Sequence, residues 1–272
     1  MKITIPETID LQKTENYILT VAVYPNRFSF SFFDCEKGTF CFFFQTEELP
    51  DNAVFSVFKE VLFANDFLSL SYKKVYIING SYTFTYIPES LFEEKDTRTY
   101  LNFLFKDNSG KILSEREDAF EFVIVHAIQE DIYEFLLRSF VNVHIVHYTA
   151  PIIHFLQHHS LLPMQYMVIN KSSSGEMDIF CFSDRQLLLG NHFHVPVLKE
   201  AIYHSLFVWQ QMNLNKKEDS LFIVERDSEL TDSLKSHIRQ IDAFHLPKGI
   251  FSDSIRAQEI PLEISCLALS YF

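Results

Sequence analysis

The sequence predicts an α/β protein in which two similar halves of the chain each form a mixed sheet flanked by helices. Each half begins with three short apolar runs typical of strands joined by tight turns, and it continues with alternating helical and strand patterns. The halves are offset by about 145–150 residues, a period that is too long for a solenoid and indicates two related domains. With 272 residues the chain is also long enough for two domains.

The first half opens with an expected antiparallel meander. Pro-Asn-Arg at 25–27 separates the first two strands, and a turn at 36–39 precedes the third. A polar run at 50–52 precedes a helical pattern, and Pro88 stands where it would open a second helix, because the first helical turn does not use the N–H that proline lacks. The expected strands lie at 16–24, 28–32, 40–44, 75–78, 120–128 and 141–146, and the expected helices at 53–62, 88–105, 130–138 and 150–160.

The second half repeats this order after Pro163. The polar turn Lys171-Ser172-Ser173-Ser174-Gly175 separates its first two strands, and Pro196 precedes a helix with one apolar stripe. The expected strands lie at 165–170, 177–182, 187–193, 221–224 and 241–246, and the expected helices begin at 196, 228 and 260.

This order of elements resembles the duplicated βββαβαβα unit of the actin-like ATPase superfamily, a ribonuclease H-like fold. More narrowly, the chain is similar to a bacterial family of unknown function with that fold. The resemblance implies a first actin-like domain at 1–148, which also includes a C-terminal helix at 260–272, and a second actin-like domain at 149–259. The run from Pro261 to Ser270 resembles the helix by which such proteins return to their first domain.

The resemblance also implies where a nucleotide would bind. In the superfamily the first hairpin of each domain carries Asp followed by Gly near the phosphates, and a Gly-Gly segment packs against adenosine. Here Val23-Tyr24-Pro25, Ile169 to Gly175 and Val224 to Ser228 stand at these places, with Asn170 in place of the second Asp. We therefore expect degenerate nucleotide-binding loops, no cofactor, and a non-catalytic interaction or scaffold role with a protein partner or in a homo-oligomer.

The turn Lys171-Ser172-Ser173-Ser174-Gly175 is the candidate binding site, since it could offer a cation, hydroxyls and turn amides to an anion. An ordinary solvated hairpin turn is the competing interpretation. The alternative function is a nucleotide- or small-molecule-dependent enzyme, ATPase- or kinase-like, that uses the cleft between the domains. Its residues would be Asn170, Lys171 and Asp178 around an anion, with Asp34 or Asp227 as an acid or base.

Histidines are the other candidate chemistry. Six of the 11 lie between His126 and His159, and His154 and His158 stand one helical turn apart, as metal ligands on one face would. His192 and His194 point to the same side of one expected strand. Because no carboxylate stands near the helical pair, no metal is expected. The four cysteines, at 35, 41, 181 and 266, have no C-x-x-C spacing and are expected to be free thiols.

Charge narrows the possible partners. The formal net charge of −13 disfavours nonspecific binding to nucleic acids or to an anionic membrane surface, because both depend on lysine and arginine. No apolar run approaches the ~18 residues of a membrane span, and the N-terminal residues do not resemble a secretion signal. We therefore expect a cytoplasmic protein with no nucleic-acid partner and no membrane insertion.

Overall fold

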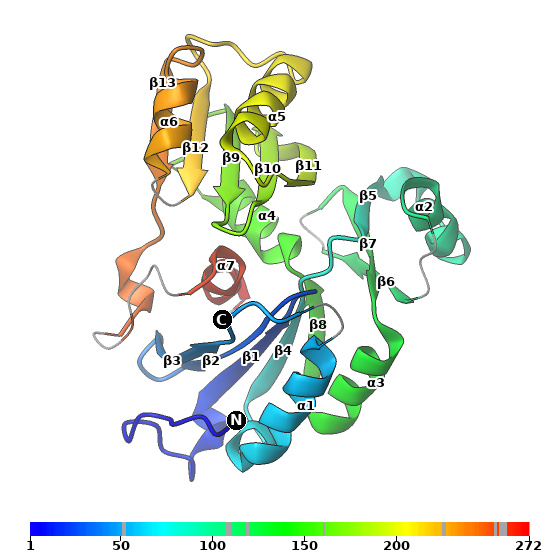
Figure 1. Cartoon of the computed structure of the whole chain (residues 1–272), viewed down its shortest axis with the longest axis vertical. Coiled ribbons are helices and arrows are strands. Elements are labelled where there is room, and N and C mark those ends of the chain that lie inside the picture. The colour runs from blue at the N-terminus through cyan, green and yellow to red at the C-terminus, as the bar shows by residue number, and fades with distance from the viewer. Residues whose placement is uncertain are drawn as a thin grey trace. The chain divides into compact units, whose positions relative to one another are not determined.

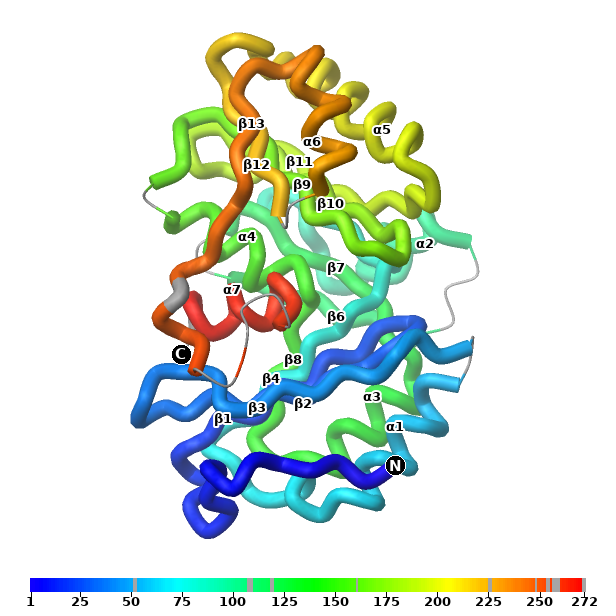
Figure 2. The backbone as a smooth tube through the Cα atoms, turned by 60° about the vertical axis from the view of Figure 1, so that its left-hand side comes forward, coloured from blue at the N-terminus to red at the C-terminus, as the bar shows by residue number. Residues whose placement is uncertain are grey.

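The computed structural model describes residues 1–50, 53–106, 110–117, 120–159, 161–224, 227–252, 255 and 260–271. The chain divides into two compact units (Figures 1 and 2). Unit 1 comprises Met1–Ile152 and Lys248–Phe272, and unit 2 comprises Ile153–Pro247. Each unit contains a five-stranded mixed sheet with helices beside it, which confirms the predicted α/β fold class.

The larger sheet of unit 1 has the strand order β3-β2-β1-β4-β8. β1 pairs antiparallel with β2 on one side and parallel with β4 on the other, so an antiparallel meander is joined to a parallel half. The expected first hairpin is present, and its turn follows Val23. The strands are β1 (Tyr17–Val23), β2 (Phe28–Asp34), β3 (Thr39–Gln45), β4 (Lys74–Asn79) and β8 (Val143–His147).

A second, three-stranded antiparallel sheet of unit 1, with the order β5-β7-β6, was not predicted. The expected helix from Pro88 to Phe105 is wrong, because Pro88 ends β5 and the helix α2 begins only at Thr97. A proline fits the end of an edge strand as well as the start of a helix, since neither place needs its N–H. The elements are β5 (Phe84–Pro88), α2 (Thr97–Leu104), β6 (Lys111–Arg116) and β7 (Phe122–Ile128).

Phenylalanines fill the space between the larger sheet of unit 1 and the helices α1 (Val54–Ala64) and α3 (Glu130–Ser139). The Phe28 and Phe30 rings of β2 lie 5.2 and 5.7 Å from the ring of Phe58 on α1. The helix α7 (Leu262–Tyr271) lies on the opposite face (Figures 1 and 2). Short 3-10 helices complete the unit: η1 (Thr14–Asn16), η2 (Asp66–Ser69), η3 (Glu89–Leu91), η4 (Glu94–Asp96) and η5 (Lys248–Ile250).

The sheet of unit 2 has the order β11-β10-β9-β12-β13, which repeats the pattern of an antiparallel meander joined to a parallel half. Its core gathers around the buried Trp209. Within the described part of the chain, none of the helices combines the length and apolar composition needed to cross a membrane. The elements are α4 (Thr149–His158), which begins in unit 1, β9 (Gln165–Lys171), β10 (Glu176–Ser183), β11 (Gln186–His194), α5 (Leu198–Gln211), β12 (Ser220–Val224), α6 (Ser228–Leu234) and β13 (Gln240–Phe244).

Candidate functional site

Equivalent turns follow the first strand of each larger sheet, at residues 24–27 after β1 and at 172–175 after β9. Both turns lie at the carboxyl end of parallel strands, because β1 runs parallel to β4 and β9 runs parallel to β12. Ligands of α/β proteins usually bind at this end of the sheet. The topology therefore singles out one candidate region in each unit.

The turn of unit 1 is closed by Tyr24. Its hydroxyl donates a hydrogen bond to the buried Glu263 of α7, and the guanidinium of Arg27 lies 4.4 Å from the centre of its ring. A Cβ built at Gly80 would lie 2.1 Å from Cδ1 of this ring, so glycine is required there. At the position where the resemblance implies an Asp, unit 1 therefore holds a tightly packed phenol.

A cavity of about 570 Å³ lies beside this turn and is within the range of small-molecule sites. Its walls come from the carboxyl ends of β1 and β4 and from the first residues of α1 and α3. Among the described lining residues there is one formally charged side chain, that of Asp131, and no lysine or arginine. The lining residues are Val23, Tyr24, Pro25, Val54, Phe55, Asn79, Ser81, Ile128, Gln129, Asp131 and Ile132.

Asn79 connects the cavity to buried ionisable groups. Its Nδ2 donates to the carbonyl of Ala127 at 2.9 Å and lies 2.8 Å from Nδ1 of His126. His126 Nε2 is 3.9 Å from Oε2 of Glu115, which also accepts the backbone N–H of His147 at 2.7 Å. Burial raises the pKa of Glu115 to about 8 and lowers the pKa of His126 to about 3. Despite their short separation, these two groups are neutral at pH 7 rather than an ion pair.

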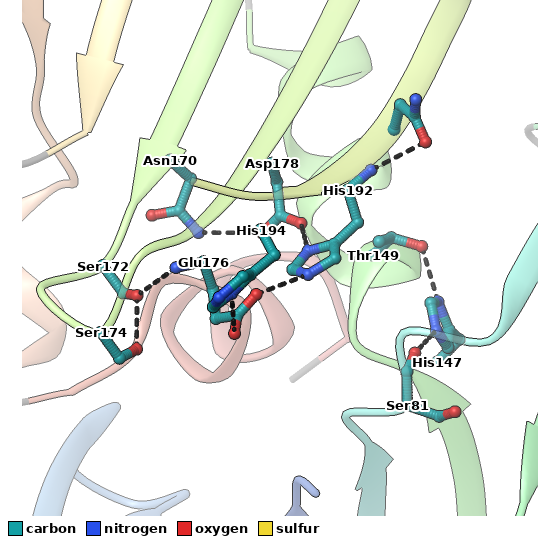
Figure 3. Close-up of polar contacts among 11 residues, drawn as sticks. Ser81, His147, Thr149, Asn170, Ser172, Ser174, Glu176, Asp178, His192 and His194 are labelled. Atoms are coloured by element: carbon teal, nitrogen blue, oxygen red, sulfur yellow. Dashed lines mark hydrogen bonds and ion pairs between the residues drawn. The ribbon is translucent and has the colours of Figure 1, made fainter. Parts of the chain in front are cut away.

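His147 extends this polar cluster at the end of β8. Its ring is completely buried and has hydrogen-bond partners at both nitrogens (Figure 3). Nδ1 lies 2.8 Å from Oγ1 of Thr149, and Nε2 lies 2.9 Å from the carbonyl oxygen of Ser81. Neither the cavity nor this cluster was predicted from the sequence, because β4, β6, β7 and β8 come together only in the folded unit.

The predicted anion-binding turn of unit 2 makes most of its hydrogen bonds within itself. The amides of Ser172 and Gly175 donate to the carbonyls of Glu176 and Ser172, at 2.8 and 3.3 Å. The hydroxyl of Ser172 lies 2.8 Å from that of Ser174 and accepts the N–H of Glu176 (Figure 3). Gly175 has a φ of +89°, and a Cβ there would lie 3.0 Å from Cα of Pro196. An anion site at this turn stays a prediction.

The cation of the turn is already paired. Nζ of Lys171 lies 3.0 Å from Oδ2 of Asp227, whose other carboxylate oxygen accepts the N–H of Leu230 at the start of α6. Burial alone would raise the pKa of Asp227, but these two contacts outweigh it and lower the pKa. Glu225 and Arg226, which precede it in the expected adenosine loop, lie outside the described residues.

A cluster of opposite charges links β10 and β11 beside this turn (Figure 3). His192 lies between two carboxylates, with Nδ1 2.9 Å from Oδ1 of Asp178 and Nε2 2.8 Å from Oε2 of Glu176. The other oxygen of Glu176 lies 3.0 Å from Nδ1 of His194, and Asn170 donates to Asp178 at 3.5 Å. Only the doubly protonated imidazolium can donate to both carboxylates. Burial opposes this charge, but Asp178 and Glu176 outweigh it and raise the pKa of His192.

The structure brings Asn170, Lys171, Asp178 and Asp227 to one end of the unit 2 sheet. Asp34, the other predicted acid or base, pairs with the start of β1 in the register and forms an ion pair with Lys37 at 3.0 Å. It therefore lies at the opposite end of the unit 1 sheet from the candidate region.

The predicted histidine pair on α4 is adjacent in the structure. The rings of His154 and His158 are stacked at 4.5 Å, and Nδ1 of His158 lies 2.8 Å from the carbonyl oxygen of His154. In the part of the chain that the structure describes, no three histidine, cysteine, aspartate or glutamate side chains are arranged to hold a metal ion. The four cysteines are free thiols, as expected.

Comparison with known proteins identifies the family. A Bacteroides thetaiotaomicron protein with an actin-like ATPase fold and unknown function superposes with a TM-score of 0.80, at 25% identity, over 96% of this chain and 98% of that one. The PilM-PilN type IV pilus biogenesis complex contains a chain that superposes with a TM-score of 0.60, at 11% identity, over 93% of this chain and 97% of that one. No curated protein sequence matches. The model of the family described as "Protein of unknown function (DUF3822)" matches residues 6–241, so the chain belongs to that family and has the actin-like ATPase fold that its sequence predicts.

Proposed function

We propose that this protein is a non-catalytic interaction or scaffold module whose nucleotide-binding loops no longer hold phosphate. The observation that carries the proposal is Tyr24, which fills the turn after β1 and bonds to Glu263. Burial raises the pKa of Glu263 to about 7, so a nucleotide here would meet a phenol and a carboxyl that is partly ionised at neutral pH. The cavity beside this turn supports the same conclusion, because the described residues that line it include no cation for a phosphate.

The turn of unit 2 also opposes phosphate binding. Lys171 is neutralised by Asp227 at 3.0 Å, and the amides of Ser172 and Gly175 donate within the turn. Glu176 and Asp178 place two carboxylates beside it. A phosphate would have to displace these contacts and approach negative charge, which costs free energy in a half-buried site.

We further propose that this protein acts in the cytoplasm and binds a protein partner, which can be a second copy of this chain. One chain of the PilM-PilN type IV pilus biogenesis complex shares this fold at 11% identity. This supports the idea that such a fold can serve in an assembly. A net charge of −13 argues against nucleic acid as the partner.

The enzyme alternative requires an anion at Lys171 and a free acid or base nearby. Asp227 is engaged with both Lys171 and the start of α6, and Asp34 lies at the far end of the other sheet. These positions favour the non-catalytic proposal over an ATPase- or kinase-like enzyme.

Thermal unfolding with and without millimolar Mg-ATP tests the proposal, together with an ATP hydrolysis assay. We expect no hydrolysis and a shift in Tm below about 2 °C, because a ligand far below its Kd contributes little stability. A larger shift, or hydrolysis above that of the buffer, would overturn the proposal.

A Lys171→Ala, Ser173→Ala double variant provides the matched control. We expect neither the wild type nor the variant to bind labelled ATP or inorganic phosphate. Binding by the wild type that the double variant loses would instead establish the predicted anion site in unit 2.

A further inference from the structure

The proposed function leaves the cavity beside the turn after β1 without an assigned ligand. All of its described lining residues belong to unit 1, and they include the starts of α1 and α3. These two helices lie side by side on one face of the larger sheet, where the rings of Phe55 and Phe135 are 5.6 Å apart (Figures 1 and 2). A volume of about 570 Å³ is enough for a ligand with an aromatic ring system.

Much of the cavity wall is apolar. The rings of Tyr24 and Phe55 line it, and Arg27 and Lys59, which lie over these rings, are not among the described lining residues. Burial of an apolar or aromatic ligand against this wall would remove its surface from water, which favours binding. The buried aliphatic side chains of the wall are those of Val23, Val54, Ile128 and Ile132.

Asn79 places a hydrogen-bond acceptor in this apolar wall. Its side chain is 4% exposed, and its Nδ2 lies 2.9 Å from the carbonyl oxygen of Ala127 and 2.8 Å from Nδ1 of His126. The contact with Ala127 fixes the orientation of the amide, because only Nδ2 can donate to a carbonyl. Within the described part of the chain Oδ1 has no hydrogen-bond partner. It is therefore available to a donor on a ligand in the cavity.

Asp131 is the one formally charged side chain among the described lining residues, and it is exposed. Its Oδ1 accepts the N–H of Ile132 at 3.1 Å, and among the described residues no cation pairs with Oδ2. The N-terminus of α3 attracts negative charge, but Glu130 and Asp131 in its first turn already supply that charge. The cavity thus offers one acceptor in its buried wall and one carboxylate on its solvent side.

We propose that this cavity binds an arylalkylamine, a small organic monocation whose aromatic ring carries an N–H donor and whose side chain ends in an ammonium. The ring would lie against the apolar wall and donate to Oδ1 of Asn79, and the ammonium would donate to the carboxylate of Asp131. An anionic ligand would meet a carbonyl oxygen and a carboxylate at the same places. This site goes beyond the interaction function proposed above and does not rest on it.

NMR titration of the isotope-labelled whole protein with three indoles tests the charge preference. Tryptamine, tryptophol and indole-3-propionate share the ring, but their side chains end in an ammonium, a hydroxyl and a carboxylate. We expect tryptamine to bind with a Kd of about 1 mM or below, and tryptophol about fivefold more weakly, because a partly exposed ion pair contributes about that factor. Indole-3-propionate should not bind. Equal affinities, tighter binding of the carboxylate, or no binding of tryptamine at about 10 mM would overturn the proposal.

Asp131→Asn removes the carboxylate at an exposed position and should leave the fold intact. We expect it to weaken the binding of tryptamine about fivefold and to leave that of tryptophol unchanged. Glu130→Gln is the matched control, because it changes the net charge equally at a neighbouring residue that is not among the described lining residues. It should bind tryptamine as the wild type does. An equal loss in both variants would mean that only the general charge of the protein attracts the amine, and would overturn the site.

The acceptor of Asn79 can be tested in the wild type. 1-Methyltryptamine lacks the ring N–H and should bind about fivefold more weakly than tryptamine, which is the loss of one hydrogen bond. The amide signals of Asn79 and Ile132 should shift with tryptamine, whereas those of Leu221 in unit 2 should not. Equal binding of the two amines, or shifts confined to unit 2, would overturn this assignment. ATP hydrolysis would overturn the proposed function and leave this site in place.

Discussion

The turns after β1 and β9 occupy the same place in two sheets of the same topology, yet they accommodate ionisable groups in opposite ways. In unit 1, removal from water raises the pKa of Glu115 and Glu263 and lowers the pKa of His126, so it favours the uncharged form of all three groups. In unit 2, Lys171 lies 3.0 Å from Asp227, and the carboxylates of Asp178 and Glu176 raise the pKa of His192 and so favour its charged form. The sheet topology determines where a site can form. Whether its ionisable groups are buried or ion-paired determines which ligands that site can bind.

The stability contributions of His126 in unit 1 and His192 in unit 2 change with pH in opposite directions. The lowered pKa of His126 means that the folded state loses stability as pH falls from 6.5 toward about 3, because only the unfolded chain takes up the proton readily. The raised pKa of His192 gives stability that is present below pH 6.5 and is lost as pH rises through the folded value. Histidine resonances followed by NMR should therefore move in separate pH ranges for these two rings.

The largest loss of stability is expected from a substitution that disrupts the packed turn of unit 1. Gly80→Ala places a Cβ 2.1 Å from the ring of Tyr24, so we expect it to lower the free energy of unfolding by about 3 kcal/mol, as overpacking of a rigid core does. Gly249→Ala, which has open space around it, should be nearly neutral. Denaturant unfolding measures both variants, and equal stabilities would show that the turn is loosely packed.

A second prediction concerns the buried carboxyl of unit 1. The raised pKa of Glu115 means that wild-type stability declines as pH rises from 4.5 to about 8, because the folded state must give up a proton that it holds tightly. Between roughly pH 5 and pH 9, the free energy of unfolding of Glu115→Gln should rise by about 2 kcal/mol relative to that of the wild type, since the glutamine has no proton to lose. Unfolding at several pH values measures this, with Glu60→Gln, at an exposed position of α1, as the control. A constant difference would contradict the neutral, buried assignment.

A substitution in the charged cluster of unit 2 should cause a smaller loss of stability, and the size of that loss should depend on pH. His192→Gln should cost about 1.5 kcal/mol near pH 6, where the imidazolium donates to both Glu176 and Asp178, and less at high pH, where wild type has lost that proton. His194→Gln, at a side chain that is mostly exposed, should cost less at every pH. A loss that does not change with pH would mean that His192 acts through packing alone.

The smallest effect is expected at the Lys171 ion pair. Because this pair is only partly buried, Lys171→Ala should lower stability by about 0.5 kcal/mol at low salt and by less at about 1 M salt, where screening weakens it. Lys217→Ala at an exposed position serves as the control. A loss of stability several times larger would contradict this prediction. It would mean that unit 2, like unit 1, depends on buried polar contacts.

Local sequence patterns predicted most strands and helices, because apolar periodicity and turn residues act over a few positions. They failed at Pro88, whose missing N–H fits both a helix start and the end of an edge strand. They also missed the sheet β5-β7-β6, since the apolar residues of β6 are only partly buried.

The candidate sites were predicted only in part. The sequence singled out Asp178, His192 and His194 separately, but Glu176 joined them only through the register of β10 and β11. The sequence does contain the two pairs, Glu176 and Asp178 on one strand and His192 and His194 on the next, each spaced i, i+2. Only the register of the two strands shows that the carboxylates and the imidazoles lie next to each other. The cluster of Asn79, Glu115 and His126 joins the consecutive strands β6 and β7 to the distant strand β4, a juxtaposition that no local pattern encodes.

The contact between Tyr24 and Glu263 also sets an order of events during synthesis. Unit 2 lies between the two stretches of chain that form unit 1, so a ribosome completes it before α7 emerges. Until then Tyr24 lacks its hydrogen-bond partner, and one face of the first sheet lacks the helix that covers it. We expect the inserted unit to fold first and the N-terminal unit to wait in an incomplete, aggregation-prone form, which the last helix then closes.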